Sequence, residues 1–278
     1  MREVVVADAK EHLTSHGWAL IRGLDLGADA GAAVLEVARR FGVPSARDGG
    51  REVWEIRPRP RREGPRTFSE RAGAASFHTD AQYHRRPEDI VCLATVRPAA
   101  DGGETLLLSA GSAVGALLRH DGGRRALEVL SRPGWSWTVP EIFGGPPPSG
   151  ARADTSPDTS PDGSSDGSSD GSSDGSDGGF DGDGDDDGDG DGDDGGVAVL
   201  PGDGTVRWRA DNVAAGVGRA RRRAAALFAS CLAGSRDAVL LPQRPGDLLV
   251  VDNHHVLHAR TSFRDPRRLL LRVRLWAS

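Results

Sequence analysis

A long tract built from four residue types limits what this chain can fold into. Residues 151–196 consist almost wholly of Asp, Gly, Ser and Pro, and their only apolar side chains are two Ala and one Phe. A segment of this composition cannot bury enough apolar surface to offset the conformational entropy that is lost on ordering. We therefore predict a single domain over residues 1–278 that is interrupted by a disordered insertion at about 151–196.

Calcium binding is an alternative role for this tract, because Asp and Gly recur and residues 163–174 repeat the unit Gly-Ser-Ser-Asp. Known calcium repeats need an aliphatic residue in each turn, and an EF-hand loop needs a closing Glu. The tract has neither, so we interpret it as a passive insertion. The segments on its two sides can still pair, because a long flexible loop adds little closure entropy.

The net charge of the chain depends on this tract. The whole chain has 35 basic and 41 acidic residues, which gives −6, and the tract contains 16 Asp and one Arg. The remainder carries 34 basic and 25 acidic residues, a net charge of +9. A basic body can indicate nucleic-acid binding, but the arginines are scattered and no aromatic residues alternate with them. An enzyme with an anionic small-molecule substrate and no nucleic-acid partner is the better interpretation.

The compartment is expected to be the cytoplasm. No run of apolar residues approaches the length of a membrane span, and the first eight residues lack a signal-peptide core. Cys92 and Cys231 form no Cys-x-x-Cys pair and lie in apolar surroundings, so we expect buried thiols rather than a disulfide or a metal site. No membrane partner is expected, and the oligomeric state is not predicted.

Short apolar runs separated by turn residues favour a mostly β fold with flanking helices, of the α+β class. Many short strands and a few helices are typical of an antiparallel double-sheet barrel. Strands are predicted over 18–23, 54–57, 89–97, 104–108, 135–139, 205–208, 247–251 and 269–275. Helices are predicted over 9–17, 29–41, 110–131 (with a break at 122–123) and 214–233.

The strongest local feature is the segment Phe77-His78-Thr79-Asp80. Alternate side chains of a strand share a face, so His78 and Asp80 would point the same way and suit a divalent metal. A lone His-x-Asp is more often a surface pair. A metal site also needs a third ligand from elsewhere in the chain. The candidates are His254, His255 and His258. Two His and one carboxylate are the ligand set of non-haem iron(II) oxygenases.

Further residues resemble the clavaminate synthase-like and taurine dioxygenase-like (TauD/TfdA) family. The family has a Thr or Ser some two dozen residues after the His-x-Asp/Glu pair, and an Arg shortly after a distant His. Here 24 residues separate Asp80 from Thr105, and 13 separate His258 from Arg272. The segment 78–84 is similar to the ligand segment of the amino-acid β-hydroxylases in this group, which usually has Glu where this chain has Asp80.

The resemblance implies a double-stranded β-helix (jelly-roll) core and an iron(II)- and 2-oxoglutarate-dependent dioxygenase that consumes O2. The substrate would be a small molecule, an amino acid or secondary metabolite. The enzyme would attack an unactivated C–H bond of this molecule and so hydroxylate, desaturate or cyclise it. The implied iron ligands are His78, Asp80 and His258. Thr105 and Arg272 would bind 2-oxoglutarate, with Arg274 and Arg268 as competing choices for the arginine.

Other readings stay open at this point. The same three ligands could hold zinc in a hydrolase, and a non-catalytic barrel could bind a small ligand. The carboxylate of Asp80 argues against halogenation, since related halogenases have a small residue at that position. The substrate itself is not readable. Candidate substrate residues, each equally able to be structural, are Gln82, Tyr83, Arg207, Arg209 and Asp211.

Overall fold

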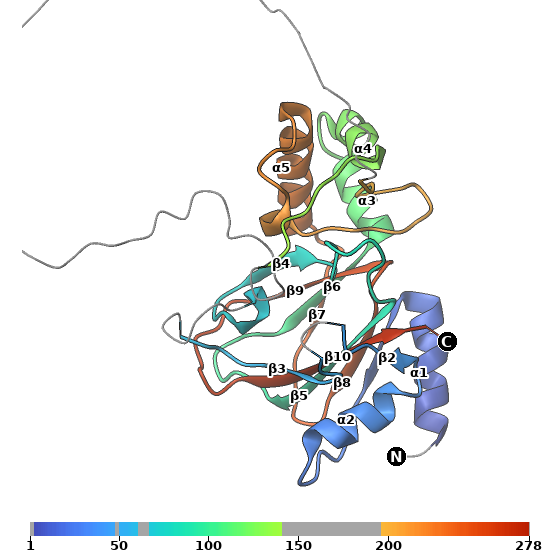
Figure 1. Cartoon of the computed structure of the whole chain (residues 1–278), viewed down its shortest axis with the longest axis vertical. Helices are drawn as coiled ribbons and strands as arrows, with labels where there is room; N and C mark the ends of the chain where they lie inside the picture. Colours follow the sequence, from blue (N-terminus) through green and yellow to red (C-terminus); the bar gives the residue numbers. More distant parts are fainter. Residues whose placement is uncertain (1–2, 48–49, 61–66, 141–195, 278) are drawn as a thin grey trace, which may run out of the picture.

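The computed structural model describes residues 3–47, 50–60, 67–140 and 196–277. The predicted insertion lies outside these ranges except for Gly196, so its disorder stays a prediction. No helix within the described ranges has the length and apolar character needed to cross a lipid bilayer. The chain ends of the described part lie near each other at the outer side of the barrel (Figure 1).

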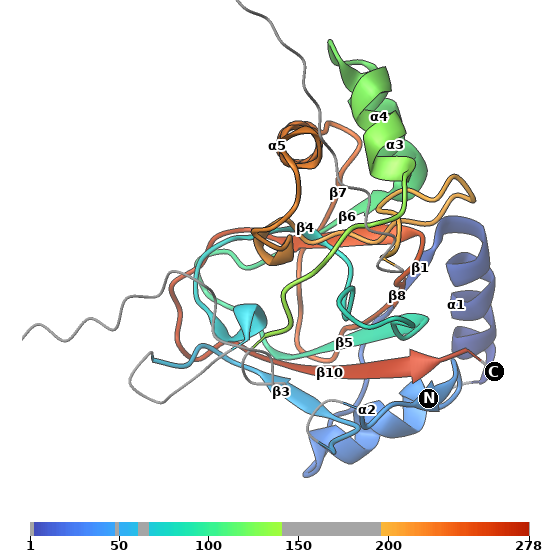
Figure 2. The same cartoon turned by 45° about the horizontal axis from the view of Figure 1, so that its top comes forward.

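Two antiparallel sheets face each other and form a barrel (Figures 1 and 2). The six-stranded sheet contains, in order, β1 (Trp18–Ile21), β8 (Leu248–Asp252), β5 (Ile90–Arg97), β10 (Leu269–Trp276) and β2 (Val43–Pro44), and β3 (Trp54–Ile56) also pairs with β10. The four-stranded sheet contains β4 (Ala75–His78), β9 (Val256–Arg260), β6 (Thr105–Ser109) and β7 (Val239–Leu241). This architecture confirms the predicted fold class, α+β with a double-stranded β-helix core.

The helices cover the outer faces of both sheets. The six-stranded sheet carries α1 (Glu3–His16) and α2 (Ala30–Ala38), and the four-stranded sheet carries α3 (Ala110–Leu118), α4 (Gly123–Ser131) and α5 (Arg219–Ala233) (Figure 1). Side chains cap two helix starts: Asp29 accepts the N–H of Ala32, and Ser109 accepts the N–H of Ser112. The predicted helices are confirmed, including the break between α3 and α4, but α1 begins at Glu3 rather than 9 and α5 begins at Arg219 rather than 214.

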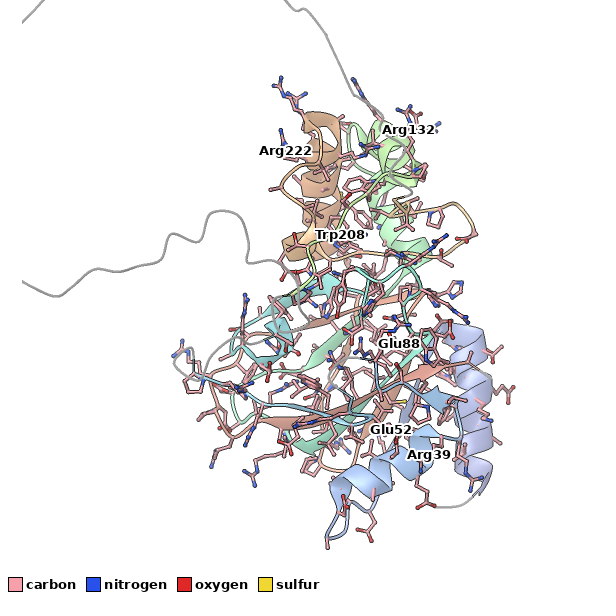
Figure 3. The ribbon with its side chains drawn as sticks, in the orientation of Figure 1. Arg39, Glu52, Glu88, Arg132, Trp208 and Arg222 are labelled. Carbon is pink, nitrogen blue, oxygen red and sulfur yellow. The ribbon has the colours of Figure 1, made fainter. Side chains whose placement is uncertain are left out.

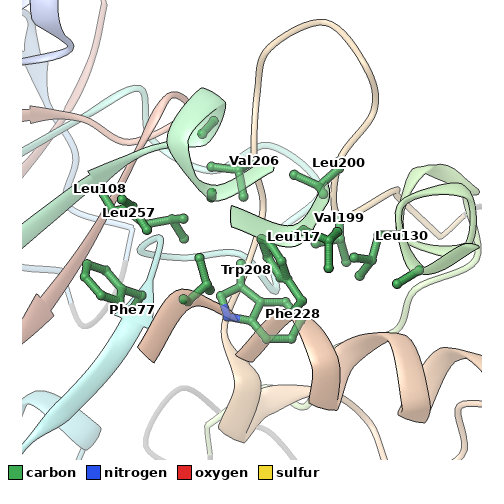
Figure 4. Close-up of a cluster of buried hydrophobic side chains, with 14 of the residues drawn as sticks. Phe77, Leu108, Leu117, Leu130, Val199, Leu200, Val206, Trp208, Phe228 and Leu257 are labelled. Carbon is green, nitrogen blue, oxygen red and sulfur yellow. The ribbon is translucent and has the colours of Figure 1, made fainter. Parts of the chain in front are cut away.

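Alternating side chains on β5 and β8 divide the apolar core into layers. Odd-numbered residues such as Val91 and Val251 are buried between the two sheets, whereas Cys92 and Val250 pack against α1 and α2. A third cluster lies between the four-stranded sheet and α3–α5 (Figure 4). The two sheets therefore enclose an interior that only β-strand side chains and adjoining loops reach. The candidate ligand residues lie in this interior.

Two predicted strands are wrong, 135–139 and 205–208. In the described structure they form only isolated bridges or no ladder, because their backbone groups bond to loops. The N–H of Val206 bonds to the carbonyl of His254, and the N–H of Trp208 bonds to the Thr79 hydroxyl. The apolar side chains of these segments instead fill the cluster under α3–α5, where Trp208 stacks edge-on against Phe228 at 5.0 Å (Figure 4).

The cysteine predictions are met in part. Both thiols are free, so no disulfide is present in the described structure. Cys92 is fully buried, and burial raises the pKa of its thiol to about 12. Cys231 is only half-buried on α5.

Candidate metal centre

Three buried side chains from distant parts of the chain meet inside the barrel. His78, Asp80 and His258 each offer a ligand atom, and these atoms all lie within 4.8 Å of one another. The Asp80 Oδ1 atom is 3.8 Å from His78 Nε2 and 3.7 Å from His258 Nε2. Within the described ranges no other group of three His, Cys, Asp or Glu residues is close enough to hold a metal.

Strand pairing and a turn bring these residues together. His78 ends β4 and is paired in register with His258 on β9, so the two imidazoles lie side by side with their ring centroids 4.2 Å apart. Asp80 is not on the strand, as the alternation argument assumed, but in the turn that follows it. The next residue, Ala81, has φ 56°, and it is the one non-glycine residue with positive φ in the described part of the chain. This turn, rather than strand parity, returns the carboxylate to the imidazoles.

Asn253 holds that turn in place from the loop between β8 and β9. Its side-chain oxygen accepts the N–H of Asp80 at 2.8 Å, and its amide group donates to the carbonyls of Asp80 and Glu88 at 3.0 and 2.9 Å. Asn253 is almost fully buried. Asn253 therefore joins the turn that carries Asp80 to the loop that leads into β9, the strand that carries His258. Sequence analysis missed this role, although Asn253 lies only five positions before His258.

The protonation states suit a divalent cation. Burial lowers the pKa of the imidazoles of His78 and His258, which favours the neutral form with a free lone pair. His78 Nδ1 bonds to the carbonyl of Ser76 at 2.8 Å, which places the proton on Nδ1 and leaves Nε2 for a ligand. Burial alone would raise the pKa of the Asp80 carboxyl, but the positive charge of Arg272 outweighs this effect and holds the pKa well below its usual value.

The donor set fits iron. Two neutral imidazole nitrogens and one ionised carboxylate on one side of a cation leave its other positions open, which is the facial arrangement of non-haem iron(II) enzymes. All three donors are buried, and His78 and Asp80 are further oriented by Ser76 and Asn253. Ligands with fixed orientations favour tight and defined metal binding.

Three arginines on or beside β10 differ in their partners. Arg272 Nη1 pairs with Asp80 Oδ2 at 3.0 Å, and Arg274 Nη1 lies 3.6 Å from Glu88, whose position in the barrel is labelled in Figure 3. Arg268 has no carboxylate partner among the described residues, although its side chain is buried. Its Nε atom has no hydrogen-bond partner there either.

A cavity between the sheets connects the ligand cluster to Arg268. Its walls come from both sheets and from the loop before β4: Ile56, Phe68, Ser69, Ala75, His78, Asp80, Leu93, Thr105, His258, Ala259, Arg260, Arg268, Leu270 and Arg272. Arg272 on β10 and Arg268, just before that strand, both line the cavity, with Arg272 beside the ligands. The side chain of Gln243 links Thr105 to Arg268, because it forms a hydrogen bond with each of them.

Phe68 and Ser69 line the cavity from the loop before β4, and Arg260 bonds to the backbone of this loop. Its guanidinium donates to the carbonyls of Ser69, Arg71 and Gly73 at 2.8–3.2 Å. Arg260 is two residues after His258 on β9 and so shares its face. That parity was a signal in the sequence from which its position in the site could have been found.

The other candidate residues have separate positions. His254 pairs with Asp89 at 3.0 Å and His255 with Asp252 at 2.9 Å, so neither is part of the ligand cluster. Arg207 donates to the carbonyls of His84 and Arg85, away from the cavity. Gln82 and Tyr83 do not line the cavity.

Arg209 is the candidate substrate residue that lies close to the cluster. Its backbone forms an isolated β-bridge with His78. Burial is the largest cause of the lowered pKa of His78 and His258, and the charge of Arg209 lowers both values further. Its guanidinium lies over the ring of Phe68 at 4.7 Å and bonds to Asp211 at 3.0 Å.

Solved structures share this fold. Asparagine oxygenase in complex with Fe(II), 2S,3S-3-hydroxyasparagine and succinate is 17% identical, with a TM-score of 0.65 over 99% of this chain and 80% of that one. The non-haem iron oxygenase OrfP with Fe, succinate and (3S)-hydroxy-L-Arg is 16% identical, with a TM-score of 0.63 over 100% and 82%. PvcB from Pseudomonas aeruginosa is 18% identical, with a TM-score of 0.54 over 98% and 80%. The search of curated proteins finds no match.

The sequence itself matches a family model. The model described as taurine catabolism dioxygenase TauD, TfdA family covers residues 2–160 and 205–274, well over half of the chain. The match includes the three clustered residues and the arginines of β10. It favours an oxygenase over the zinc hydrolase and the ligand-binding barrel. This chain belongs to the TauD/TfdA family and is a non-haem iron(II)- and 2-oxoglutarate-dependent dioxygenase.

Proposed function

We propose that this enzyme hydroxylates an unactivated C–H bond of a small molecule, an amino acid or a related secondary metabolite, with iron held by His78, Asp80 and His258. The observation that carries the proposal is the buried cluster of two imidazoles and one carboxylate at the end of a cavity between the sheets. Desaturation or ring closure of the same kind of substrate would use the same site. When bound, the iron with 2-oxoglutarate supplies the oxidising power for C–H cleavage.

The residues of this chain bind, orient and exclude water. His78 and His258 would hold the iron through neutral nitrogens and Asp80 through its carboxylate, whereas related halogenases have a small residue at the position of Asp80. Hydroxylation is therefore favoured over halogenation. Phe68 lines the cavity with its ring 6.3 Å from that of His78, and this apolar surface beside the ligands would limit the access of water.

The geometry favours Arg268, not the first-ranked Arg272, as the anchor for the distal carboxylate of 2-oxoglutarate. Arg272 and Arg274 already have carboxylate partners, whereas Arg268 is buried without one among the described residues. A buried guanidinium without a counter-ion is costly, and a bound carboxylate would relieve that cost. Thr105, predicted to bind the same group, lies beside it and lines the same cavity.

An amino acid is the proposed substrate class. Asparagine oxygenase and OrfP, whose structures hold hydroxylated asparagine and hydroxylated arginine, share this fold. Beside the cluster lie two ion pairs, Arg272 with Asp80 and Arg209 with Asp211, and the charged ends of a zwitterion can exchange partners with such pairs. The free thiols fit a reducing compartment, and we place the reaction in the cytoplasm.

Anaerobic titration tests the cofactor assignment. Iron(II) and 2-oxoglutarate should together produce a weak visible charge-transfer band that neither produces alone. A screen of free and carrier-bound amino acids, read as succinate release in the presence of O2, then identifies the substrate. Absence of the band in folded, iron-loaded protein would contradict the proposed function. Metal-dependent hydrolysis without O2 would favour the zinc-type alternative.

A further inference from the structure

The side chain of Gln243 joins the two groups that we propose as the co-substrate anchor. Its Nε2 donates to Thr105 Oγ1 at 2.8 Å, and its Oε1 accepts from Arg268 Nη2 at 3.4 Å. A guanidinium can only donate, so the amide oxygen must face Arg268 and the amide nitrogen must face Thr105. We infer that Gln243 is a positioning residue that orients both donors toward the distal carboxylate of 2-oxoglutarate; this inference rests on the proposed function.

The contact with Gln243 decides what Thr105 can do. A hydroxyl has one hydrogen to donate and lone pairs that accept. Because the Gln243 amide occupies a lone pair, the hydroxyl hydrogen of Thr105 stays available for an acceptor in the cavity that it lines. An acceptor at position 243 would reverse this arrangement by taking that hydrogen.

The contact with Gln243 also fixes the guanidinium of Arg268. Its Nη2 donates to the carbonyl of Gly103 at 3.3 Å as well as to Gln243, and the guanidinium packs on the ring of Phe263 at 5.0 Å. Nε has no partner in the described structure. Burial, and then the charge of Arg260, lower the pKa of Arg268 to about 9. The end of the cavity therefore offers oriented donors and a positive charge, which is the chemistry of a carboxylate site.

The loop that carries Gln243 is itself tied to both sheets. Leu241, at the end of β7, is paired in register with Thr105. The N–H of Gly246 bonds to Thr95, and Asp247 accepts from the N–H of Arg244 and from the guanidinium of Arg22. Gln243 therefore has its geometry before any ligand arrives, and such preorganisation reduces the entropy lost on binding.

Substitution of Gln243 tests the inference. Gln243→Glu should take the Thr105 hydrogen, pair with Arg268 and repel the incoming carboxylate. We expect its dissociation constant for 2-oxoglutarate to rise by roughly 10- to 100-fold, the range for losing hydrogen bonds to a charged group. Gln243→Leu, which removes both contacts without adding charge, should show a smaller rise. Binding is measured by titration calorimetry on manganese(II)-loaded protein without O2, so the readout does not depend on turnover.

Three controls separate positioning from general damage. Arg244→Ala changes the adjacent exposed side chain and should bind 2-oxoglutarate like the parent. Manganese(II) affinity and the thermal midpoint of Gln243→Glu should stay close to the parent values. A 2-oxo acid that lacks the distal carboxylate should bind the parent and Gln243→Glu equally.

The outcomes distinguish the two levels of the argument. Unchanged 2-oxoglutarate affinity in Gln243→Glu and Gln243→Leu would overturn the role of Gln243 and leave the proposed function standing. Equal weakening of the short 2-oxo acid would mean that the loop acts on the metal end of the cavity, which also overturns the inference. A metal-loaded parent that binds no 2-oxoglutarate would overturn both.

Discussion

The two carboxylate oxygens of Asp80 face different partners. One oxygen lies between the imidazoles of His78 and His258, and the other pairs with Arg272 at 3.0 Å. The ion pair keeps the carboxylate ionised in a buried place, which is the form that a metal needs. The same pair also means that removing Asp80 leaves a buried guanidinium uncompensated.

Replacement of Asp80 should therefore affect metal binding and stability together. Asp80→Ala is expected to abolish succinate formation, to weaken manganese(II) binding and to lower the free energy of unfolding by about 3–5 kcal/mol, the usual cost of breaking a buried pair. Succinate assays, metal titration and urea unfolding check these three effects. Asp80→Glu, which keeps the charge, should retain metal binding. Full turnover by Asp80→Ala would remove Asp80 from the ligand set.

At the scale of elements, the site depends on two connections that meet at Asn253. From the loop between β8 and β9, its side chain makes three hydrogen bonds to the connection between β4 and β5, two to Asp80 and one to Glu88. These segments are far apart in the chain, and no ladder joins Asp80 to β9. The amide of Asn253 replaces that ladder.

Loss of this amide should destabilise the ligand turn. Asn253→Ala leaves the N–H of Asp80 and the carbonyl of Glu88 buried without their side-chain partner, so we expect the free energy of unfolding to fall by about 2–4 kcal/mol. Urea unfolding of metal-free protein measures the change. Asn212→Ala is the matched control, because the amide nitrogen of Asn212 makes no hydrogen bond in the described structure. Equal effects of the two substitutions would contradict the stabilising role of the Asn253 hydrogen bonds.

Attachment of the helical layer depends on apolar packing. Phe228 of α5 is fully buried against Trp208, and the backbone of Trp208 bonds to Thr79 next to the ligand Asp80 (Figure 4). Phe228→Ala should lower the free energy of unfolding by about 3–5 kcal/mol, as for other buried aromatic truncations. Leu118→Ala, which shortens a side chain that is 46% exposed, should cost less than about 1 kcal/mol. Chemical denaturation compares the two, and a similar cost would show that α5 is loosely packed.

At the scale of the whole molecule, charge is uneven along the chain, since 16 of its 41 acidic residues lie in the tract 151–196. Arg132 and Arg222 lie at the ends of α4 and α5 that are farthest from the barrel (Figure 3). The acidic tract lies in the chain between α4 and α5. Trp135, before the tract, and Val197, after it, form an isolated β-bridge. The packed layers are complete without the tract.

Deletion of residues 155–195 should therefore leave activity largely intact. A shorter loop costs less conformational entropy to close, so the free energy of unfolding should stay equal or rise by about 1 kcal/mol. Succinate release and urea unfolding of the deleted and full-length proteins make the comparison. Loss of folded protein on deletion would show that the tract has a structural role, and loss of activity alone would indicate a functional one.

Local patterns in the sequence determined much of the fold and of the site. Apolar runs predicted the long strands β5, β8 and β10, because a buried strand needs continuous apolar residues. Residue spacing brought together His78, Asp80 and His258 and implied the family. These properties depend on which residue types occur and in what order, and both can be read without coordinates.

Only the tertiary structure decided how side chains from separate segments share partners. The alternation of Thr205–Trp208 is that of a strand, yet this segment forms no ladder with the adjacent edge strand β4, because its backbone groups bond to the loops at Thr79 and His254. Strand parity placed Asp80 correctly beside His78 but for the wrong reason, since a turn held by Asn253 aims it. Arg272 and Arg268 cannot be distinguished by spacing, because a guanidinium on a long side chain takes its partner from whichever carboxylate the opposite strand or turn brings within reach.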